Sequence, residues 1–199
     1  MMRLVPAGLL ACLLLLTACA ATAATTAEGA ERKRPTAVSE IDLEQYMGRW
    51  YEVARYPNSY QKGTVGVVAH YLIRDDGRIV LRNTARKKTL EGREKKGSGT
   101  GKVVRGSNGA KWDVTFVWPF TADYWIIELC PEYSWAVVGQ PSRKNLWILS
   151  RSPKLEDETY AEIVGRLAKH GYDAGRLRRT PQPGDAPTFE PGEDGRIRR

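Results

Sequence analysis

The chain has 199 residues, of which 42% are hydrophobic and 27% charged, and it carries a formal net charge of +8. This length allows one medium domain with additional chain, since domains typically run about 100–150 residues. The composition is that of an ordinary globular protein, which argues against a disordered or fibrous one. The positive charge favours an anionic partner, and by itself it leaves nucleic acid, a membrane surface and acidic small molecules open.

Residues 1–18 have the composition of a signal peptide. Arg3 precedes an uncharged run from Leu4 to Ala18. A basic start, a short apolar stretch and small residues at the end are typical of a secretory signal, and the run is too short to span a membrane as a mature helix. The sequence Leu16-Thr17-Ala18-Cys19 resembles the lipobox of bacterial lipoproteins. The resemblance implies cleavage before Cys19, lipidation of its sulfur and anchoring in the outer membrane, facing the periplasm; a plain secretory signal is the alternative.

The remaining chain divides into a tether, a domain and a tail. Residues 19–40 are rich in Ala and Thr and then charged, which predicts a flexible tether. Residues 181–199 carry Pro, Gly and charges with few large apolar groups, and we expect them to be disordered. Residues 41–180 are long enough for one hydrophobic core. Because an exported protein is not expected to meet nucleic acid, we expect the basic residues to face a lipid or a surface.

The domain is predicted to be all-β, because short strands alternate with turns. Asp75-Asp76-Gly77 and Gly106-Ser107-Asn108-Gly109 are strong hairpin turns, since Gly and Asn accept a positive φ. Eight antiparallel strands joined in sequence predict an up-and-down barrel. The predicted strands are Trp50–Tyr56, Val65–Arg74, Arg78–Arg86, Gly97–Arg105, Lys111–Trp118, Asp123–Cys130, Tyr133–Gly139 and Asn145–Ser150.

One amphipathic helix follows the strands. Tyr160, Ile163, Val164 and Leu167 recur at the spacing of a single apolar stripe. Acidic residues precede the stripe, where they complement the helix dipole, and Gly171 follows it as a left-handed cap. We expect the stripe to pack on the outside of the barrel.

Three motifs in this order resemble the signatures of the lipocalin family. Gly48-Arg49-Trp50-Tyr51-Glu52 is similar to the Gly-x-Trp motif that opens the first strand. Thr121-Ala122-Asp123-Tyr124 is similar to the Thr-Asp-Tyr motif with one extra residue, and Leu146 to Arg151 to a final strand that ends in Arg. The resemblance is strongest to bacterial lipocalins of the outer-membrane lipoprotein type, which are apolipoprotein D-like. It implies an eight-stranded barrel that holds one small ligand.

The family topology places the first strand's start and the last strand's end at the closed end of the barrel. Arg151 is then expected to stack on Trp50, a cation–π contact worth about 0.5–2 kcal/mol. Gly48, Trp50 and Arg151 are therefore predicted to be structural. Loops 57–64, 87–94, 119–122 and 140–144 would ring the mouth. Basic residues at the mouth would suit a ligand with a negative head group; the alternative is that they are solvated loop charges. We call these residues the basic rim: Arg86, Lys87, Lys88, Arg93 and Arg143.

Alternation along the strands predicts the inward side chains. If Trp50 faces inward, alternation along the first strand also turns Glu52, Ala54 and Tyr56 inward. If Arg151 faces inward, alternation along the last strand turns Leu149 and Trp147 inward. Val68, His70 and Leu72 are the predicted inner set of the second strand, and Tyr124, Ile126 and Glu128 that of the sixth. Aromatic and aliphatic groups with a few polar atoms are typical of a small-molecule pocket. The predicted ligand pocket is Tyr56, His70, Tyr124, Ile126 and Trp147.

These features predict a membrane-anchored carrier of a fatty acid or lysophospholipid, acting in envelope lipid storage or repair. No catalytic residues are expected, because the two histidines form no cluster with Cys and no Ser-His-Asp order is present. A carrier of haem, with His70 as axial ligand, or of another hydrophobic molecule is one alternative. A structural envelope lipoprotein with a solid barrel is another.

The remaining expectations concern cofactors and partners. No cofactor or metal is expected, and the partners are a lipid ligand and the membrane, with a homodimer left open. Cys12 leaves with the signal and Cys19 carries lipid, so Cys130 is left as a lone thiol without a disulfide partner. Trp118-Pro119-Phe120 at the lip of the barrel is expected to touch the membrane from which the lipid is taken.

Overall fold

The computed structural model of the protein describes residues 35–183, which include all of the predicted barrel. The predicted signal peptide, Cys19, most of the tether and residues 184–199 lie outside the described residues. Within residues 35–183, no helix is long and apolar enough to cross a membrane.

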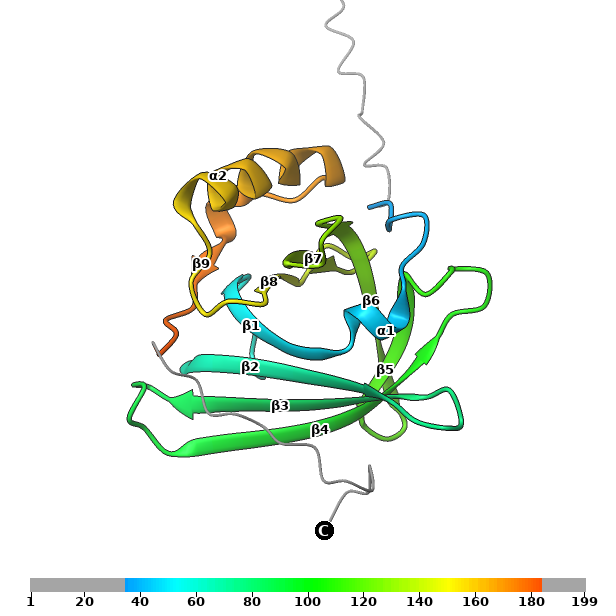
Figure 1. The fold of residues 1–199 in the computed structure, drawn as a ribbon. Coiled ribbons are helices and arrows are strands. Elements are labelled where there is room, and N and C mark those ends of the chain that lie inside the picture. The colour runs from blue at the N-terminus through cyan, green and yellow to red at the C-terminus, as the bar shows by residue number, and fades with distance from the viewer. Residues whose placement is uncertain (1–34, 184–199) are drawn as a thin grey trace, which may run out of the picture. The chain divides into compact units, whose positions relative to one another are not determined.

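Eight antiparallel strands close into a barrel (Figure 1). Each strand pairs with the next in sequence, and β1 also pairs with both β8 and β2, which closes the ring. The predicted fold class is thus confirmed. The strands are β1 (Gly48–Arg55), β2 (Thr64–Ile73), β3 (Ile79–Lys87), β4 (Glu94–Val103), β5 (Lys111–Val117), β6 (Phe120–Leu129), β7 (Trp135–Gly139) and β8 (Leu146–Ser150).

Four strands begin earlier than the sequence predicts, and the difference is three residues in β4 and β6. β4 starts at Glu94 rather than at Gly97, because Arg86 pairs with Glu94 and carries the ladder to the end of β3. β6 starts at Phe120 rather than at Asp123, because Trp118 and Pro119 form the whole connection from β5. The predicted hairpin turns behave as expected: Gly77 has φ +74°, and Asn108 and Gly109 also have positive φ.

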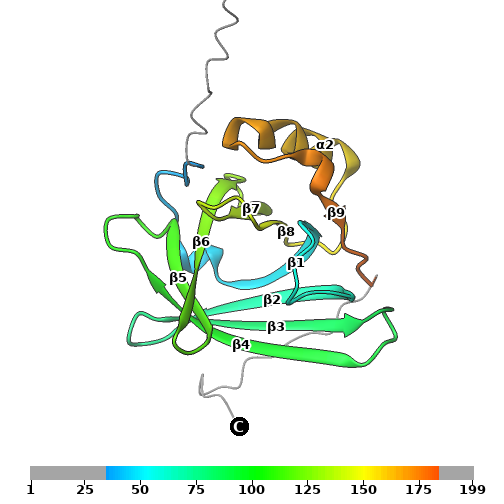
Figure 2. The same cartoon turned by 180° about the vertical axis from the view of Figure 1, so that it is seen from behind.

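The helices lie outside the strands. α1 (Leu43–Tyr46) covers the closed end, and α2 (Asp157–Arg166) continues into a 3₁₀ turn, η1 (Leu167–His170), that ends at left-handed Gly171. Figure 2 shows α2 over β7 and β8, on the side of the barrel away from β3. Ile163 and Leu167 of the predicted stripe are fully buried against the outer face of these strands. Burying two such side chains contributes about 1.5–3 kcal/mol each.

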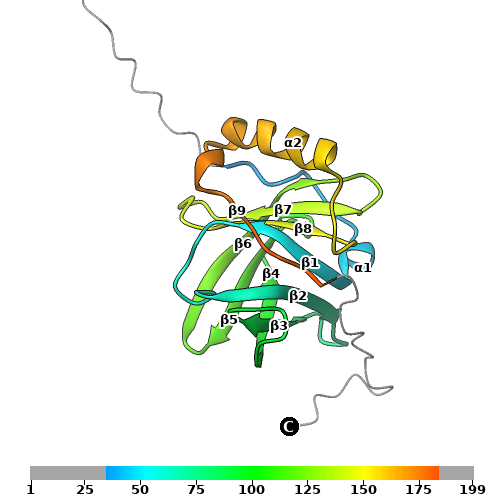
Figure 3. The ribbon, with the colours of Figure 1, turned by 90° about the vertical axis from the view of Figure 1, so that its left-hand side faces the viewer.

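The C-terminal end of the domain completes the wall between β1 and β2 (Figure 3). β1 pairs with β2 over Gly48–Tyr51 and then lies against β8 and the short β9 (Arg178–Arg179), which follows the 3₁₀ turn η2 (Ala174–Arg176). Beyond β9, Gly66 N donates to Pro181 O at 2.8 Å. The Gln182 amide donates to the carbonyls of both Glu52 and Val67. Residues 181–183, assigned to the tail from sequence, therefore bridge two strands of the barrel.

Candidate functional site

The closed end of the barrel has a floor built around Trp50. The Arg151 guanidinium lies 3.7 Å from the centroid of the Trp50 ring, in the contact that the motifs predict. Arg151 also donates to the carbonyls of Gln45 and Arg49, at 2.6 and 2.8 Å, and Trp50 Nε1 donates to Tyr46 O at 2.8 Å. These bonds tie α1 to the ends of β1 and β8, so the floor is both packed and hydrogen-bonded.

Three tyrosines fill the barrel above this floor. Tyr46 and Tyr124 share a hydrogen bond between their hydroxyls at 2.9 Å, and Tyr124 donates to Tyr71 at 3.1 Å. Trp112 stacks on Tyr124 with ring centroids 4.6 Å apart. Burial raises the pKa of all three phenols, so each is a neutral hydroxyl at physiological pH. This half of the barrel is a solid aromatic core, in which Ile126 is also fully buried.

Tyr56 was predicted to line the pocket, and this is wrong. The pairing of β1 with β8 shifts between Glu52 and Ala54, a β-bulge that interrupts the alternation of faces. Val53, Ala54 and Tyr56 therefore all pack in the outer cluster beneath α2. Tyr56 is fully buried there and donates to Asp173 O at 2.7 Å.

The predicted inner set of β2 is also wrong. Trp50 pairs with Ala69, and both belong to the interior cluster with Tyr71, so Val68, His70 and Leu72 face outward. His70 lies on the outer wall directly between Arg49 of β1 and Arg82 of β3. Burial, together with the nearby Arg49, Arg82 and Arg151, lowers its pKa. The haem-carrier alternative thereby loses the axial ligand on which it rested.

Glu128 faces outward for the same reason as Tyr56. A bulge between Ile126 and Glu128 places Ile127 and Glu128 under α2. There Glu128 accepts from Arg166 at 2.8 Å and lies 3.1 Å from His170 Nε2. Burial alone would raise the pKa of Glu128, but its bonds to His170 and Arg166 outweigh burial and lower it. Glu128 thus fastens the helix to the barrel.

The half of the barrel toward the mouth has small inward positions. Gly97, Gly99 and Gly101 of β4 pair with Asn83, Leu81 and Ile79 of β3, two of which are interior core residues. A Cβ on Gly101 would contact Leu81 and Ile79, and one on Gly99 would lie 2.8 Å from the ring of Phe116. A Cβ on Gly97 would meet nothing within 4 Å. Along β4, the inward space is therefore filled at Gly101 and Gly99 and open at Gly97.

Two of the predicted pocket residues are interior but only partly buried. Tyr124 and Trp147 belong to the interior cluster but keep part of their side chains exposed. Gln61 accepts from Trp147 Nε1 at 2.9 Å, and Tyr60 packs on the same indole. Sequence reasoning missed Asn83, Gly97 and Phe116. The alternating glycines of β4 were the available signal, because period-two glycines in a strand leave one face without side chains.

A buried carboxylate lies beside the open half. Glu52 is 3% exposed and accepts hydrogen bonds from Arg55, from Gln61 Nε2 and, at 2.7 Å, from Thr180 Oγ1. Burial raises its pKa, while Arg55 and these hydrogen bonds oppose the rise. Glu52 was predicted to face inward, and its partners join β1, the β1–β2 loop and the C-terminal segment into one network.

The predicted basic rim divides into two groups. Arg86, Lys87, Lys88 and Arg93 all lie at the tip of the β3–β4 hairpin, and all but Arg86 are exposed. Arg143 does not share their surroundings: its guanidinium packs against Gly171, and its Nε donates to His170 O at 2.8 Å. Arg143 holds the β7–β8 loop to the end of η1, so its assignment to the rim is corrected. Lys95, which sequence reasoning missed, reaches Tyr60 O at 2.9 Å.

An apolar tip lies at the β5–β6 hairpin. Val117, Trp118 and Phe120 are 68%, 85% and 75% exposed, and Phe116, which covers Gly99, is 48% exposed. The Trp118–Pro119 peptide bond at the turn is cis. Contiguous large apolar side chains of this kind mark surfaces that contact a partner or a membrane.

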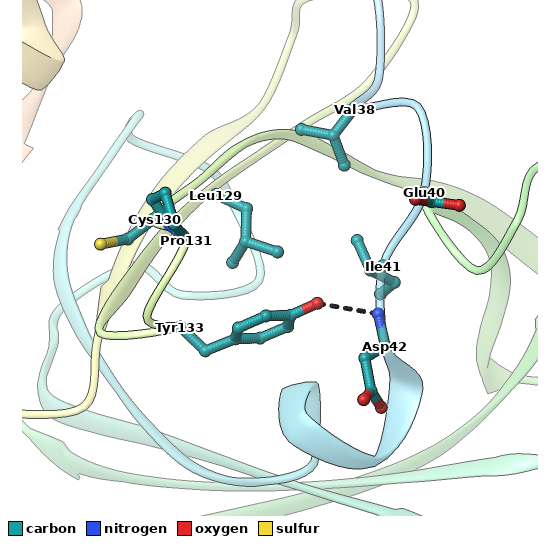
Figure 4. Close-up of a pocket in the computed structure, with 8 residues that line it drawn as sticks. All are labelled: Val38, Glu40, Ile41, Asp42, Leu129, Cys130, Pro131 and Tyr133. Atoms are coloured by element: carbon teal, nitrogen blue, oxygen red, sulfur yellow. Dashed lines mark hydrogen bonds between the residues drawn. The ribbon is translucent and has the colours of Figure 1, made fainter.

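A separate groove lies outside the barrel at its closed end (Figure 4). It has a volume of about 550 Å³ and is lined by Val38, Glu40, Ile41, Asp42, Leu129, Cys130, Pro131 and Tyr133. The Tyr133 hydroxyl accepts a hydrogen bond from Asp42 N at 2.8 Å, 91 positions away in the sequence. The sulfur of Cys130 points away from the groove's centre, toward Glu132 and Ser134. Within residues 35–183, no group of three His, Cys, Asp or Glu side chains is placed to hold a metal ion.

Comparison with known proteins agrees with this architecture. Residues 41–182 match the model of the lipocalin-like domain. Temperature-induced lipocalin-1 of Arabidopsis thaliana is 38% identical over 164 residues, covering 76% of this chain and 85% of that protein. Outer membrane lipoprotein Blc of Escherichia coli K12 is 34% identical over 149 residues, covering 75% of this chain and 84% of that protein. Insecticyanin of Manduca sexta has a similar fold, with a TM-score of 0.60 at 20% identity over 75% of this chain and 85% of that one.

Proposed function

Since the chain belongs to the lipocalin family, we propose that it is an envelope lipoprotein that holds a fatty acid or a lysophospholipid in its barrel. Lipocalins are binding and transport proteins whose eight-stranded barrels hold one small hydrophobic ligand. The observation that carries the proposal is the change in the barrel interior at Gly99. Below it the core is solid, whereas the inward space at Gly97 is empty within 4 Å.

The surroundings of the open half suit an amphiphile. Trp147 and Tyr124, which are interior but partly exposed, and Phe116, which is 48% exposed beside Gly99, would contact an acyl chain. Burying about 14 methylenes at roughly 0.8 kcal/mol each gives about 11 kcal/mol. Association costs of about 4–15 kcal/mol offset most of this gain. The head group then decides the affinity, and the β3–β4 tip supplies Lys87, Lys88 and Arg93 for a negative one.

The apolar tip and the basic tip together support uptake from a membrane. Both lie at hairpin ends that connect strands at the mouth, and the solid floor lies at the other end of the same strands. Trp118 and Phe120 would enter the bilayer surface while the lysines contact anionic head groups.

Anchoring through Cys19 is the second part of the proposal. Its support is the lipobox-like sequence before Cys19 and the similarity to proteins named outer membrane lipoproteins in Vibrio cholerae and Escherichia coli. Several acyl chains hold a protein stably on a membrane, whereas one does not. Replacing Cys19 with Ser should leave unprocessed precursor, and normal processing with membrane retention would contradict the lipobox interpretation.

The head-group contact is tested by titrating delipidated protein with a fatty acid and with its neutral methyl ester, at low and high salt. One charge-assisted hydrogen bond adds about 1.5–3 kcal/mol, so the acid should bind at least tenfold more tightly at low salt. The Lys87→Gln/Lys88→Gln variant should lose part of this preference. Lys154→Gln/Lys169→Gln, which removes the same charge near α2, should keep it. Equal, salt-insensitive affinity for both ligands would mean that the rim is only a solvated surface, and binding of neither would favour the structural alternative with a solid barrel.

A further inference from the structure

Lys95 is a basic residue on the inner face of the barrel wall. The pairing of β3 with β4 runs without a register shift from Gly101 to Glu94, so the side chains of β4 alternate between the two faces along this whole length. Gly101 lies opposite the core residue Ile79, which places it on the inner face. Lys95 is therefore on the same face, two residues beyond Gly97 in the direction of the mouth.

The side chain of Lys95 reaches over the mouth of the barrel. Its Nζ donates a hydrogen bond at 2.9 Å to Tyr60 O, in the loop between β1 and β2. The ring of Tyr60 packs on Trp147 of β8, with ring centroids 6.5 Å apart. Because β4 and β8 are four strands apart in the closed ring of eight, they lie on opposite sides of the barrel. Tyr60 thus spans the mouth, and the ammonium group of Lys95 lies at one side of it.

The charge of Lys95 has no acidic partner. None of the ion pairs within residues 35–183 includes Lys95, whereas the next residue, Lys96, is on the outer face and lies 3.5 Å from Glu94. An ammonium group has three N–H donors, and Tyr60 O accepts from one of them. Lys95 is exposed, so a ligand can reach the other two, and the inward space at Gly97 beside it is open. A cation with available donors therefore lies at the entrance to this space.

We propose that Lys95 binds the anionic head group of the ligand, a carboxylate or a phosphate, while the alkyl chain enters the space at Gly97; this inference rests on the proposed function. The bond to Tyr60 O holds the ammonium group over the mouth before the ligand arrives, which lowers the entropy cost of ordering a long side chain. The basic residues of the β3–β4 tip attract a negative head group from solution. Lys95 then makes the direct, charge-assisted hydrogen bond to it.

The test compares two anions with a neutral ligand of the same chain length: dodecanoic acid, dodecyl phosphate and methyl dodecanoate. Calorimetry measures their binding to delipidated protein in about 0.15 M salt, where the attraction between more distant charges is screened. Wild type should bind at least one anion about tenfold more tightly than the ester, the contribution of one charge-assisted hydrogen bond. Lys95→Gln should lose most of this preference and bind the ester as wild type does. The anion that loses more affinity identifies the head group.

Lys96→Gln is the matched control, because it removes the same charge from the adjacent position on the outer face, and it should keep the preference. An unchanged preference in Lys95→Gln, an equal loss in Lys96→Gln, or no preference in wild type would overturn the role of Lys95 and leave lipid binding intact. A lower melting temperature of Lys95→Gln, with the ester weakened as much as the anions, would overturn it too, because Lys95 would then only hold the loop. Binding of none of the three ligands would overturn the proposed function as well.

Discussion

The two halves of the barrel are built on the same strands but from different side chains. Toward the closed end, Trp50, Trp112 and the tyrosines fill the interior, and both indoles donate to backbone carbonyls. Toward the mouth, the inward positions of β3 and β4 include Asn83, Ala85 and Gly97, whose side chains fill much less of the interior than the aromatic residues do. A barrel can thus be stabilised from one end, and the other end is left free for a ligand. Substitutions should therefore act on stability in one half and on binding in the other.

The largest effect on stability is expected at the floor. Trp50→Ala should lower the free energy of unfolding by about 3–5 kcal/mol, because it leaves a cavity and removes the stacking partner of Arg151. Urea unfolding measures the loss. Trp118→Ala, which removes an exposed indole in the open half, should change stability by no more than about 0.5 kcal/mol. Equal unfolding midpoints for the two variants would contradict the division into two halves.

The glycines of β4 allow the same comparison within one strand. Gly99→Ala places a methyl group 2.8 Å from the Phe116 ring and 2.9 Å from Thr115 O, and overpacking of this kind costs about 1–3 kcal/mol. Gly97→Ala places its methyl in open space and should be neutral or stabilising by up to about 1 kcal/mol, because glycine is unfavourable in a strand. Thermal melting of both variants is the measurement. Equal destabilisation would show that the filled region extends to Gly97.

Much of this arrangement follows from the sequence. The Gly-x-Trp motif and the strand ending in Arg151 predicted the floor contact, and the turn glycines predicted the hairpins. The assignment of faces failed at Tyr56 and Glu128, because each follows a bulge that inserts an extra residue without a composition signal. His70 was assigned to the wrong face because the register of β2 is set by its pairing with β1, which alternation within one strand does not reveal. Arg143 was misplaced because its partner, the His170 carbonyl, is a backbone group.

Glu52, which is buried, and Glu128, which is partly buried, should respond to pH in opposite directions. The folded-state pKa of Glu52 is raised by burial, so the native state holds the proton more strongly than the unfolded chain. Wild type should therefore lose stability relative to Glu52→Gln as the pH rises above the ordinary glutamate pKa of 4.5. The pKa of Glu128 is lowered, so its stabilisation of wild type relative to Glu128→Gln should be fully present above the ordinary glutamate pKa and should be lost as the pH falls below that value. Chemical denaturation of wild type and both variants between about pH 3 and pH 8 measures these differences in stability. If the free energies of unfolding of all three proteins changed in parallel with pH, the two opposite pKa shifts would be contradicted.

The smallest effect on stability, and a specific effect on ligand uptake, is expected at the apolar tip. Trp118→Ser/Phe120→Ser should slow the transfer of a fluorescent fatty acid from anionic vesicles several-fold, because it removes the apolar contact with the bilayer. Its melting temperature should not change, since both side chains are exposed. Ile73→Ser removes an exposed apolar side chain from the β2–β3 hairpin at the closed end and should transfer lipid at the wild-type rate. If the Ile73 variant slowed transfer equally, general hydrophobicity rather than the tip would be responsible.

The central claim is that the open half, beginning at Gly97, is the ligand site. Gly97→Leu would place a side chain in this space without meeting any atom at its Cβ. Native mass spectrometry of wild type and of this variant, both purified from their own envelope, measures the bound lipid directly. The account predicts a lipid adduct on wild type and little or none on Gly97→Leu, with equal melting temperatures after delipidation. The same lipid mass on both proteins would contradict it.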